Sequence, residues 1–264
     1  MHHTLNEPHC LEWDDRLLLA DKELVAKLNA TLGRLNVLRA VEITVSGPFA
    51  RSKIAWKLAT YQHVLLHRIV ALIDGVAVAC NNRCALAAIL SARALMETVA
   101  AVAALEANVL SQLANKDLSQ IDAIAQRGIS ASRDTEWLRT NPELIATNVV
   151  TYIDKLNKIA PGVRSHYDAL SELCHPNSRG HNFLFSTLDR SDGTVRFCDE
   201  RDPQGNAHMI FAALALFPLV ESMMPRLDAM ILEVSDLQHG SYPVGDPPPS
   251  GTLQLNRPSS QTLG

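Results

Sequence analysis

The sequence has few aromatic residues and no excess of positive charge. Phe, Trp and Tyr make up only 5% of its 264 residues, and 24 Lys and Arg against 28 Asp and Glu give a formal net charge of −4. A mildly acidic chain of this kind is unlike a protein whose main task is to coat nucleic-acid phosphates. Runs of aromatic and β-branched residues are also scarce, whereas Ala and Leu, which favour helices, are abundant.

The cysteine content and the apolar runs also exclude some classes of protein. An odd number of cysteines, with no apolar signal segment ahead of them, argues against a disulfide framework, so we expect reduced thiols and a cytoplasmic location. A bilayer span requires a stretch of about 20 uncharged residues, and the best candidate, residues 209–232, contains Glu221, Arg226 and Asp228. We therefore expect no membrane partner. The cysteines are Cys10, Cys80, Cys84, Cys174 and Cys198.

The patterning predicts one all-α domain over residues 13–238, a bundle of six or seven helices with one small β-hairpin before the last helix. Residues 1–12 are polar and unpatterned, and we expect them to be flexible. From Gly240 onward Pro, Gly and Ser dominate, and such a segment buries too little apolar surface to offset the entropy of ordering it. We therefore expect a disordered tail over residues 239–264.

Apolar residues recur at three- and four-residue steps along most of the domain, as in amphipathic helices. Ser52 is expected to cap one helix, and Asn141-Pro142-Glu143 provides a cap, a first-position Pro and an acid for the start of another. Pro218 is expected to bend the last helix. The expected helices cover residues 14–44, 52–82, 83–109, part of 111–140, 141–160, 163–175 and 206–238.

The period of the pattern changes between residues 183 and 199. Two short alternating runs, 183–188 and 194–198, flank Arg190-Ser191-Asp192-Gly193, a sequence that favours a turn. The segment therefore predicts a β-hairpin. Because a lone hairpin is only marginally stable in water, we expect it to pack against the helices.

The segment 84–105 is almost entirely apolar and is expected to lie inside the bundle. Arg93 and Glu97 are its only charged residues, and their four-residue spacing places them on one face of the helix. Burying two charges is costly unless they pair and find further hydrogen bonds. The pair is therefore either a structural ion pair between neighbouring helices or part of a functional pocket.

A second polar cluster occupies residues 166–180. Tyr167, Ser171 and His175 are spaced i, i+4 and i+8, so one helical stripe carries a phenol, a hydroxyl and an imidazole. His175 is expected in the last turn of its helix, where the helix dipole favours the protonated imidazole. Pro176 is then expected to end the helix.

The two clusters form one site if their helices are neighbours. Glu97 would orient and charge His175, and Arg93 would hold a phosphate or carboxylate. The predicted catalytic residues of such a site are His175, Glu97 and Tyr167, and its predicted ligand-binding residues are Arg93, Ser171, Asn177 and Arg179.

Two motifs occur in this order: an Arg-x3-Glu helix at Arg93–Glu97, and a Tyr-x2-Leu-Ser-x3-His-Pro segment at Tyr167–Pro176. In combination they resemble a family of uncharacterised bacterial all-helical proteins, over about residues 50–235. Some members of that family are similar to HEPN-type helical domains, which include toxin and phage-defence RNases. The resemblance implies a helical fold and, as an alternative function, metal-independent RNA cleavage.

HEPN nucleases carry an Arg, four to six residues, and then a His, with a polar residue after the Arg. Arg201 and His208 fit this spacing, and Asp202 follows the Arg. A chain with this many Arg and His residues contains such a match by chance. Pro203 and Gly205 also predict a loop here rather than a helix.

Two pairs of residues have the four-residue spacing of helical metal ligands. His63 and His67 form one pair, and Cys80 and Cys84 form the other. Neither pair is accompanied by the further ligands of a zinc site. We therefore predict no metal and no cofactor.

The sequence leaves three functional hypotheses open, and it does not decide whether the chain is an enzyme. The first is a binding or interaction module of a bacterial defence or stress system, with a buried Arg93–Glu97 pair near His175. The second is a HEPN-like RNase that uses His175, or Arg201 and His208. The third is a sensor that binds a small anion through Arg93. The expected partners are therefore RNA or a small anion, and a homodimer is compatible with the wide apolar faces of the helices.

Overall fold

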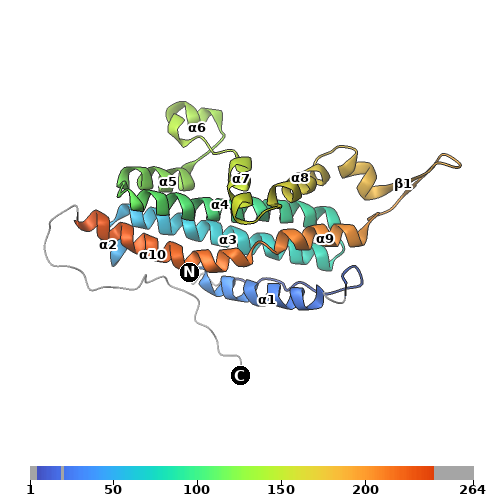
Figure 1. The fold of residues 1–264 in the computed structure, drawn as a ribbon, viewed down its shortest axis with the longest axis horizontal. Helices are drawn as coiled ribbons and strands as arrows, with labels where there is room; N and C mark the ends of the chain where they lie inside the picture. Colours follow the sequence, from blue (N-terminus) through green and yellow to red (C-terminus); the bar gives the residue numbers. More distant parts are fainter. Residues whose placement is uncertain (1–4, 19–20, 241–264) are drawn as a thin grey trace, which may run out of the picture.

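The computed structural model describes residues 5–18 and 21–240, and helices dominate this part of the chain (Figure 1). One antiparallel hairpin, β1 (Ser186–Asp189) and β2 (Thr194–Phe197), is the only sheet within it. The α-helices are α1 (Asp21–Leu38), α2 (Pro48–Arg51), α3 (Lys53–Asn81), α4 (Ala85–Ala114), α5 (Leu118–Ser130), α6 (Thr135–Thr140), α7 (Val149–Ile159), α8 (Val163–Cys174), α9 (Pro203–Leu214) and α10 (Pro218–Gly240), with a 3₁₀ turn η1 (Pro142–Leu144) and a π-helical turn η2 (Arg179–Phe183).

Helix α4 lies at the centre of the bundle and packs against α3, α5, α7, α8, α9 and α10. In Figure 1 the helices α3, α4, α9 and α10 run along the long axis, with α5, α7 and α8 on one side and α1 on the other. Leu95, Met96 and Val99 of α4 are fully buried. The prediction that this helix lies inside an all-α bundle is therefore confirmed.

The structure contains ten α-helices within the described residues, so the predicted count of six or seven is wrong. One reason is that the expected last helix is two helices. Pro218 has no N–H to continue the hydrogen-bond ladder, and Phe217 bonds instead to the Leu214 carbonyl three residues back. Pro218 thus starts α10 rather than bending a continuous helix.

The predicted starts of two helices are also wrong. The first helix was expected from residue 14, but Asp14 accepts hydrogen bonds from the backbone and guanidinium of Arg16, and α1 begins at Asp21. The sequence 141–143 forms only the turn η1, because Ile145 forms a parallel bridge with Ser132. Helix α7 begins later, with Asn148 as its cap. By contrast, the predicted cap Ser52 accepts from the Ala55 N–H at 3.0 Å.

The predicted hairpin is confirmed, but its contact with the helices is limited to its base. There Cys198 N–H donates to the Phe185 carbonyl and Arg201 N–H donates to that of Leu184, a buried residue. All four residues of β2 are exposed. Figure 1 shows the hairpin extending beyond one end of the bundle, so it does not pack along the helices as expected.

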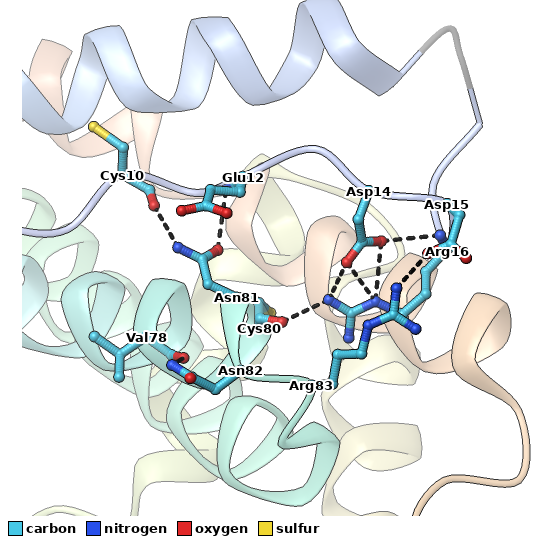
Figure 2. Close-up of polar contacts among 10 residues, drawn as sticks. All are labelled: Cys10, Glu12, Asp14, Asp15, Arg16, Val78, Cys80, Asn81, Asn82 and Arg83. Carbon is cyan, nitrogen blue, oxygen red and sulfur yellow. Dashed lines mark hydrogen bonds and ion pairs between the residues drawn. The ribbon is translucent and has the colours of Figure 1, made fainter.

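Residues 10–16 lie across the turn between α3 and α4 (Figure 2). The Asn81 side chain donates to the Cys10 carbonyl and accepts from the Glu12 N–H, and the Arg16 guanidinium donates to the Cys80 carbonyl at 2.6 Å. Arg83 has a positive φ of 55° in this tight turn. The sequence predicted that residues 1–12 are flexible. In the structure, Cys10 and Glu12 of that segment form hydrogen bonds with the Asn81 side chain at the end of α3.

Three stretches of the described chain are long and apolar enough to cross a membrane by length and composition: Lys53–Asn81, Ala85–Ala114 and Pro203–Gly240. The sequence predicted no stretch that could span a membrane. In the most apolar 18-residue window of each stretch, about half of the residues are buried inside the bundle. The predicted cytoplasmic location stays a prediction, and from residue 241 the predicted tail lies outside the described residues.

Candidate functional site

Arg93, Glu97 and Tyr167 form a polar cluster between α4 and α8. Arg93 Nη2 lies 3.4 Å from Glu97 Oε1. The Tyr167 hydroxyl donates to Glu97 Oε1 at 2.9 Å and accepts from Arg93 Nη2 at 3.1 Å. The guanidinium also lies 5.3 Å from the centre of the Tyr167 ring. The structure thus brings together three of the residues that the sequence singled out.

The cluster is open to solvent along one edge. The side chains of Arg93 and Glu97 are 27% and 25% exposed, so the pair is not sealed in the core as a structural pair was expected to be. Burial by itself lowers the pKa of Arg93, but the Tyr167 hydrogen bond and the Glu97 carboxylate raise it overall. The guanidinium is therefore charged, and Glu97 already balances that charge.

His175 does not belong to this cluster. It is exposed, and within the described residues its imidazole makes no hydrogen bond or ion pair with Glu97 or Arg93. It is the C-cap of α8: its N–H donates to the Ser171 carbonyl, but its φ of −84° and ψ of 148° are extended, so the predicted last-turn position is off by one residue. The reason is Pro176, whose ring disfavours helical geometry in the preceding residue.

The other three residues predicted near the cluster have different surroundings. Ser171 Oγ is buried and makes no hydrogen bond with the described residues. Asn177 has a structural role, because its Oδ1 accepts from the N–H groups of Arg179 and Gly180 and so begins η2. The Arg179 side chain is exposed. Among the described residues, neither Asn177 nor Arg179 makes a hydrogen bond or ion pair with the Arg93 cluster.

Arg201 and His208 do not meet either. The Arg201 guanidinium packs over the Phe183 ring, 5.1 Å from its centre, while His208 Nε2 lies 3.8 Å from an Asp21 carboxylate oxygen. The predicted loop around them is wrong as well: Pro203 takes the first position of α9, where its missing N–H costs nothing, and the chain is helical from there through His208.

Both spaced histidines form hydrogen bonds with the backbone of one residue. His63 Nδ1 accepts from the Ala40 N–H and His67 Nε2 donates to the Ala40 carbonyl. Together they fix the chain where it leaves α1. Across the part of the chain that the structure describes, no group of three His, Cys, Asp or Glu side chains is arranged to hold a metal ion.

A cavity of about 470 Å³ lies between α3, α4, α5 and α7, and it was not predicted from the sequence. Its rim includes the segment after η1, which the bridge between Ser132 and Ile145 ties to the end of α5. The lining contains no carboxylate. Its members are Tyr61, Ala101, Ala104, Leu105, Asn108, Gln112, Gln120, Ile124, Arg127, Gly128, Ala131, Ile145, Ala146, Thr147, Thr151, Tyr152 and Lys155.

Two exposed cations lie at this cavity, and neither has a carboxylate partner among the described residues. Lys155 Nζ contacts the Asn108 side-chain oxygen at 3.1 Å, and Arg127 Nε reaches only the Ala123 carbonyl of its own helix. The nearby acids are engaged elsewhere: Asp122 pairs with Lys57, Asp154 with Arg164, and Glu106 with Arg226. The cavity therefore has an unbalanced positive charge.

Two phenols complete the polar lining. The Tyr61 ring lies where a side chain at position 128 would be, since a Cβ on Gly128 would come within 2.2 Å of it. Gly128 thus makes room for the ring. Burial and the neighbouring Tyr152 phenol raise the pKa of Tyr61 to about 12, so its hydroxyl stays protonated near neutral pH and is able to donate a hydrogen bond.

Helical spacing is the one sequence signal that leads to the cavity. On α5 the lining residues Gln120, Ile124, Arg127 and Gly128 are spaced i, i+4, i+7 and i+8, which is one helix face. On α4 the line through Arg93 and Glu97 continues into the cavity. No motif marks the α5 stripe or the part of α4 that lines the cavity, so the chemistry becomes visible only when the helices are placed side by side.

Comparison of the chain with known protein families, with curated proteins and with solved structures finds no match. The resemblance described from the two motifs therefore stays an expectation.

Replacing Tyr167 with Phe is expected to destabilise the fold by about 1–2 kcal/mol, the cost of removing a hydroxyl that satisfies two charged groups. Urea denaturation followed by circular dichroism measures this loss. Tyr152→Phe is the matched control, because the Tyr152 hydroxyl makes no hydrogen bond with the described residues, and we expect it to change stability by less than about 0.5 kcal/mol. Equal losses in the two variants would show that the Tyr167 bridge contributes nothing specific.

Proposed function

We propose that this chain is a binding module that holds a small anionic molecule in the cavity between α3, α4, α5 and α7. The observation that carries the proposal is the unbalanced charge of that cavity: Arg127 and Lys155 line it, and no carboxylate does. Ligand sites commonly occupy about 300–1,000 Å³, and a cavity of about 470 Å³ lies within that range.

The remaining lining residues suit a ligand with further polar groups. The amides of Asn108, Gln112 and Gln120 both donate and accept hydrogen bonds. Leu105 and Ile124 supply apolar surface beside them. A carboxylate or phosphate on a compact, hydrogen-bonding body fits this combination, and two cations without a carboxylate partner in a partly enclosed site favour such an anion.

The proposal keeps the anion-sensor hypothesis but moves it away from Arg93. Glu97 and Tyr167 already engage Nη2 of the Arg93 guanidinium, although its Nε is buried without a hydrogen-bond partner among the described residues, so an anion arriving there would have to compete with a carboxylate. Arg127 and Lys155 face no such competitor. The RNase alternative gains no support, because His175 makes no hydrogen bond or ion pair with Arg93 among the described residues, and Arg201 and His208 contact separate partners.

Thermal unfolding in the presence of anions tests the proposal. Citrate and inorganic phosphate, compared with sodium chloride at equal ionic strength, are expected to raise the Tm, because a ligand that binds only the folded state stabilises it by about 2.7 kcal/mol at one hundred times its Kd. Lys155→Gln and Arg127→Gln are each expected to weaken binding about tenfold or more, which corresponds to loss of one charged contact.

Two control variants separate this site from its alternatives. Lys158→Gln removes the same charge from the same helix at a residue outside the lining, and it is expected to keep the full rise in Tm. Arg93→Gln is expected to keep it too. A rise that survives in Lys155→Gln and Arg127→Gln but disappears in Arg93→Gln would assign the anion to the Arg93 cluster, and no rise with either anion would reject the proposal.

A further inference from the structure

The cavity between α3, α4, α5 and α7 has more polar groups than a simple anion would engage. Besides its two cations, six lining side chains end in a hydroxyl or an amide that makes no hydrogen bond with the described residues. They are Tyr61, Gln112, Gln120, Thr147, Thr151 and Tyr152. A ligand of this cavity therefore meets neutral hydrogen-bonding groups as well as positive charge.

Tyr61 and Gln112 are the most informative of these residues, because both are half-buried. Polar groups that are largely taken out of water are normally hydrogen-bonded. The Tyr61 hydroxyl and the Gln112 amide have no partner among the described residues, yet they are not enclosed by protein, since the fully buried and unpartnered side-chain atoms of that part of the chain lie at other residues. Both groups therefore remain open to a molecule bound in the cavity.

The amides and the cations are divided along the cavity. Helices α4 and α5 are joined by a turn of three residues and lie side by side (Figure 1), so residues equally distant from the turn lie at similar heights. Gln112 and Gln120 lie near that turn. Arg127 lies seven residues beyond Gln120, about 10 Å further along the helix. The cavity thus has an amide end near the turn and a cationic end away from it.

Lys155 adds its charge to the cavity beside Asn108 of α4. Lys155 Nζ donates to Asn108 Oδ1 at 3.1 Å, so the oxygen of this amide is engaged and its N–H groups remain for a ligand. Asn108 lies one helical turn before Gln112, about 6 Å along α4. The amides of Gln112 and Gln120 also present an oxygen, which needs a donor, and an anion provides none.

We propose that the ligand of this cavity is a sugar phosphate, a phosphate monoester on a body rich in hydroxyl groups; the inference rests on the anion site proposed above. A phosphate monoester carries a charge of about −1.5 to −2 near neutral pH and three acceptor oxygens, which suits two cations and the Asn108 N–H groups. Hydroxyl groups both donate and accept, so they satisfy the oxygens of Gln112 and Gln120 that the phosphate leaves without a donor.

Isothermal titration calorimetry of the full chain tests the inference with four probes at equal ionic strength. Glucose 6-phosphate carries both features, methyl phosphate only the charge, glucose only the hydroxyl groups, and gluconate the hydroxyl groups with a single carboxylate. Glucose 6-phosphate is expected to bind at least about tenfold more tightly than methyl phosphate, because it gains further neutral hydrogen bonds. Gluconate is expected to bind at least about tenfold more weakly than glucose 6-phosphate, because it carries less charge, and glucose is expected to show no binding.

Replacing Gln112 or Gln120 with Leu separates the hydroxyl contacts from the charge contacts. Each variant is expected to weaken glucose 6-phosphate binding about threefold to tenfold and to leave methyl phosphate binding unchanged. Gln126→Leu is the matched control, because Gln126 belongs to α5 but not to the lining, and its amide donates to Ser130 of the same helix. It is expected to bind both phosphates like the wild type. Helical circular dichroism verifies that each variant keeps its fold.

The inference is overturned if methyl phosphate or gluconate binds as tightly as glucose 6-phosphate, or if Gln112→Leu and Gln120→Leu both keep the full preference for the sugar phosphate. The anion site itself still holds in either case, provided that Lys155→Gln weakens the binding of methyl phosphate. If none of the charged probes binds, or if Lys155→Gln and Arg127→Gln bind them like the wild type, the proposed function and this inference fail together.

Discussion

Replacing Gly180 with Ala is expected to destabilise the fold by about 3 kcal/mol or more, because the new side chain would collide with backbone. A Cβ at this position would lie 1.9 Å from the His175 carbonyl oxygen and 3.0 Å from that of Leu173. Neither oxygen belongs to a flexible side chain that could move aside. The end of α8 and the turn η2 would have to separate, and the hydrogen bond from Gly180 N–H to Asn177 would be lost with them.

Gly33→Ala provides the control for this prediction. Gly33 lies within α1, and a Cβ there would meet nothing within 4 Å. Replacing an unhindered helical glycine stabilises a protein by about 0.5–1 kcal/mol, so this variant is expected to unfold at a higher urea concentration than the wild type. If Gly180→Ala were as stable as Gly33→Ala, the close approach of η2 to α8 would be wrong.

Removing the carboxylate of Asp122 is expected to cost about 3 kcal/mol, the lower end of what breaking a buried ion pair costs. Lys57 of α3 is buried, with its Nζ 2.7 Å from Asp122 Oδ1 of α5. In Asp122→Ala the ammonium is left without its partner in a site that admits little water. The expected consequence is a lower free energy of unfolding, with the docking of α5 on α3 loosened first.

The two side chains of this ion pair differ in their exposure to solvent, and this difference provides the test. Asp122 is 41% exposed, so in Lys57→Met its carboxylate remains hydrated and the cost is expected to be within about 1 kcal/mol. The double variant Lys57→Met/Asp122→Ala is expected to be more stable than Asp122→Ala alone. Urea unfolding of all four proteins forms a double-mutant cycle, and equal losses in the two single variants would contradict the buried position of Lys57.

Local signals in the sequence were sufficient to predict most of the helices and the hairpin. Ser52 begins α3 as expected because a cap acts on N–H groups three residues away. The start expected at residue 141 failed for a non-local reason, since the pairing of Ile145 with Ser132 pulls the chain out of the helix. Local rules do not include such a contact between segments thirteen residues apart.

The candidate site was likewise predictable from the sequence only in part. The spacing of Arg93 and Glu97 was visible in the sequence, and their contact with Tyr167 required only that α4 and α8 be neighbours. The position of His175 was also within reach, because Pro176 follows it directly. The cavity was not, because its cations come from two helices whose relation to α4 depends on packing along the whole bundle. A cation without a partner cannot be recognised until all possible partners are placed.

The contacts of the N-terminal segment bear on how the chain folds while it is being synthesised. Cys10 and Glu12 bond to Asn81, and Arg34 of α1 pairs with Glu221 of α10, 187 residues later. At about 5–20 residues per second, a ribosome needs roughly 4–14 s to supply the first of these partners and considerably longer to supply the second. The earliest residues to emerge therefore wait for partners that are synthesised later, and the polar composition of residues 5–16 keeps them soluble through that interval.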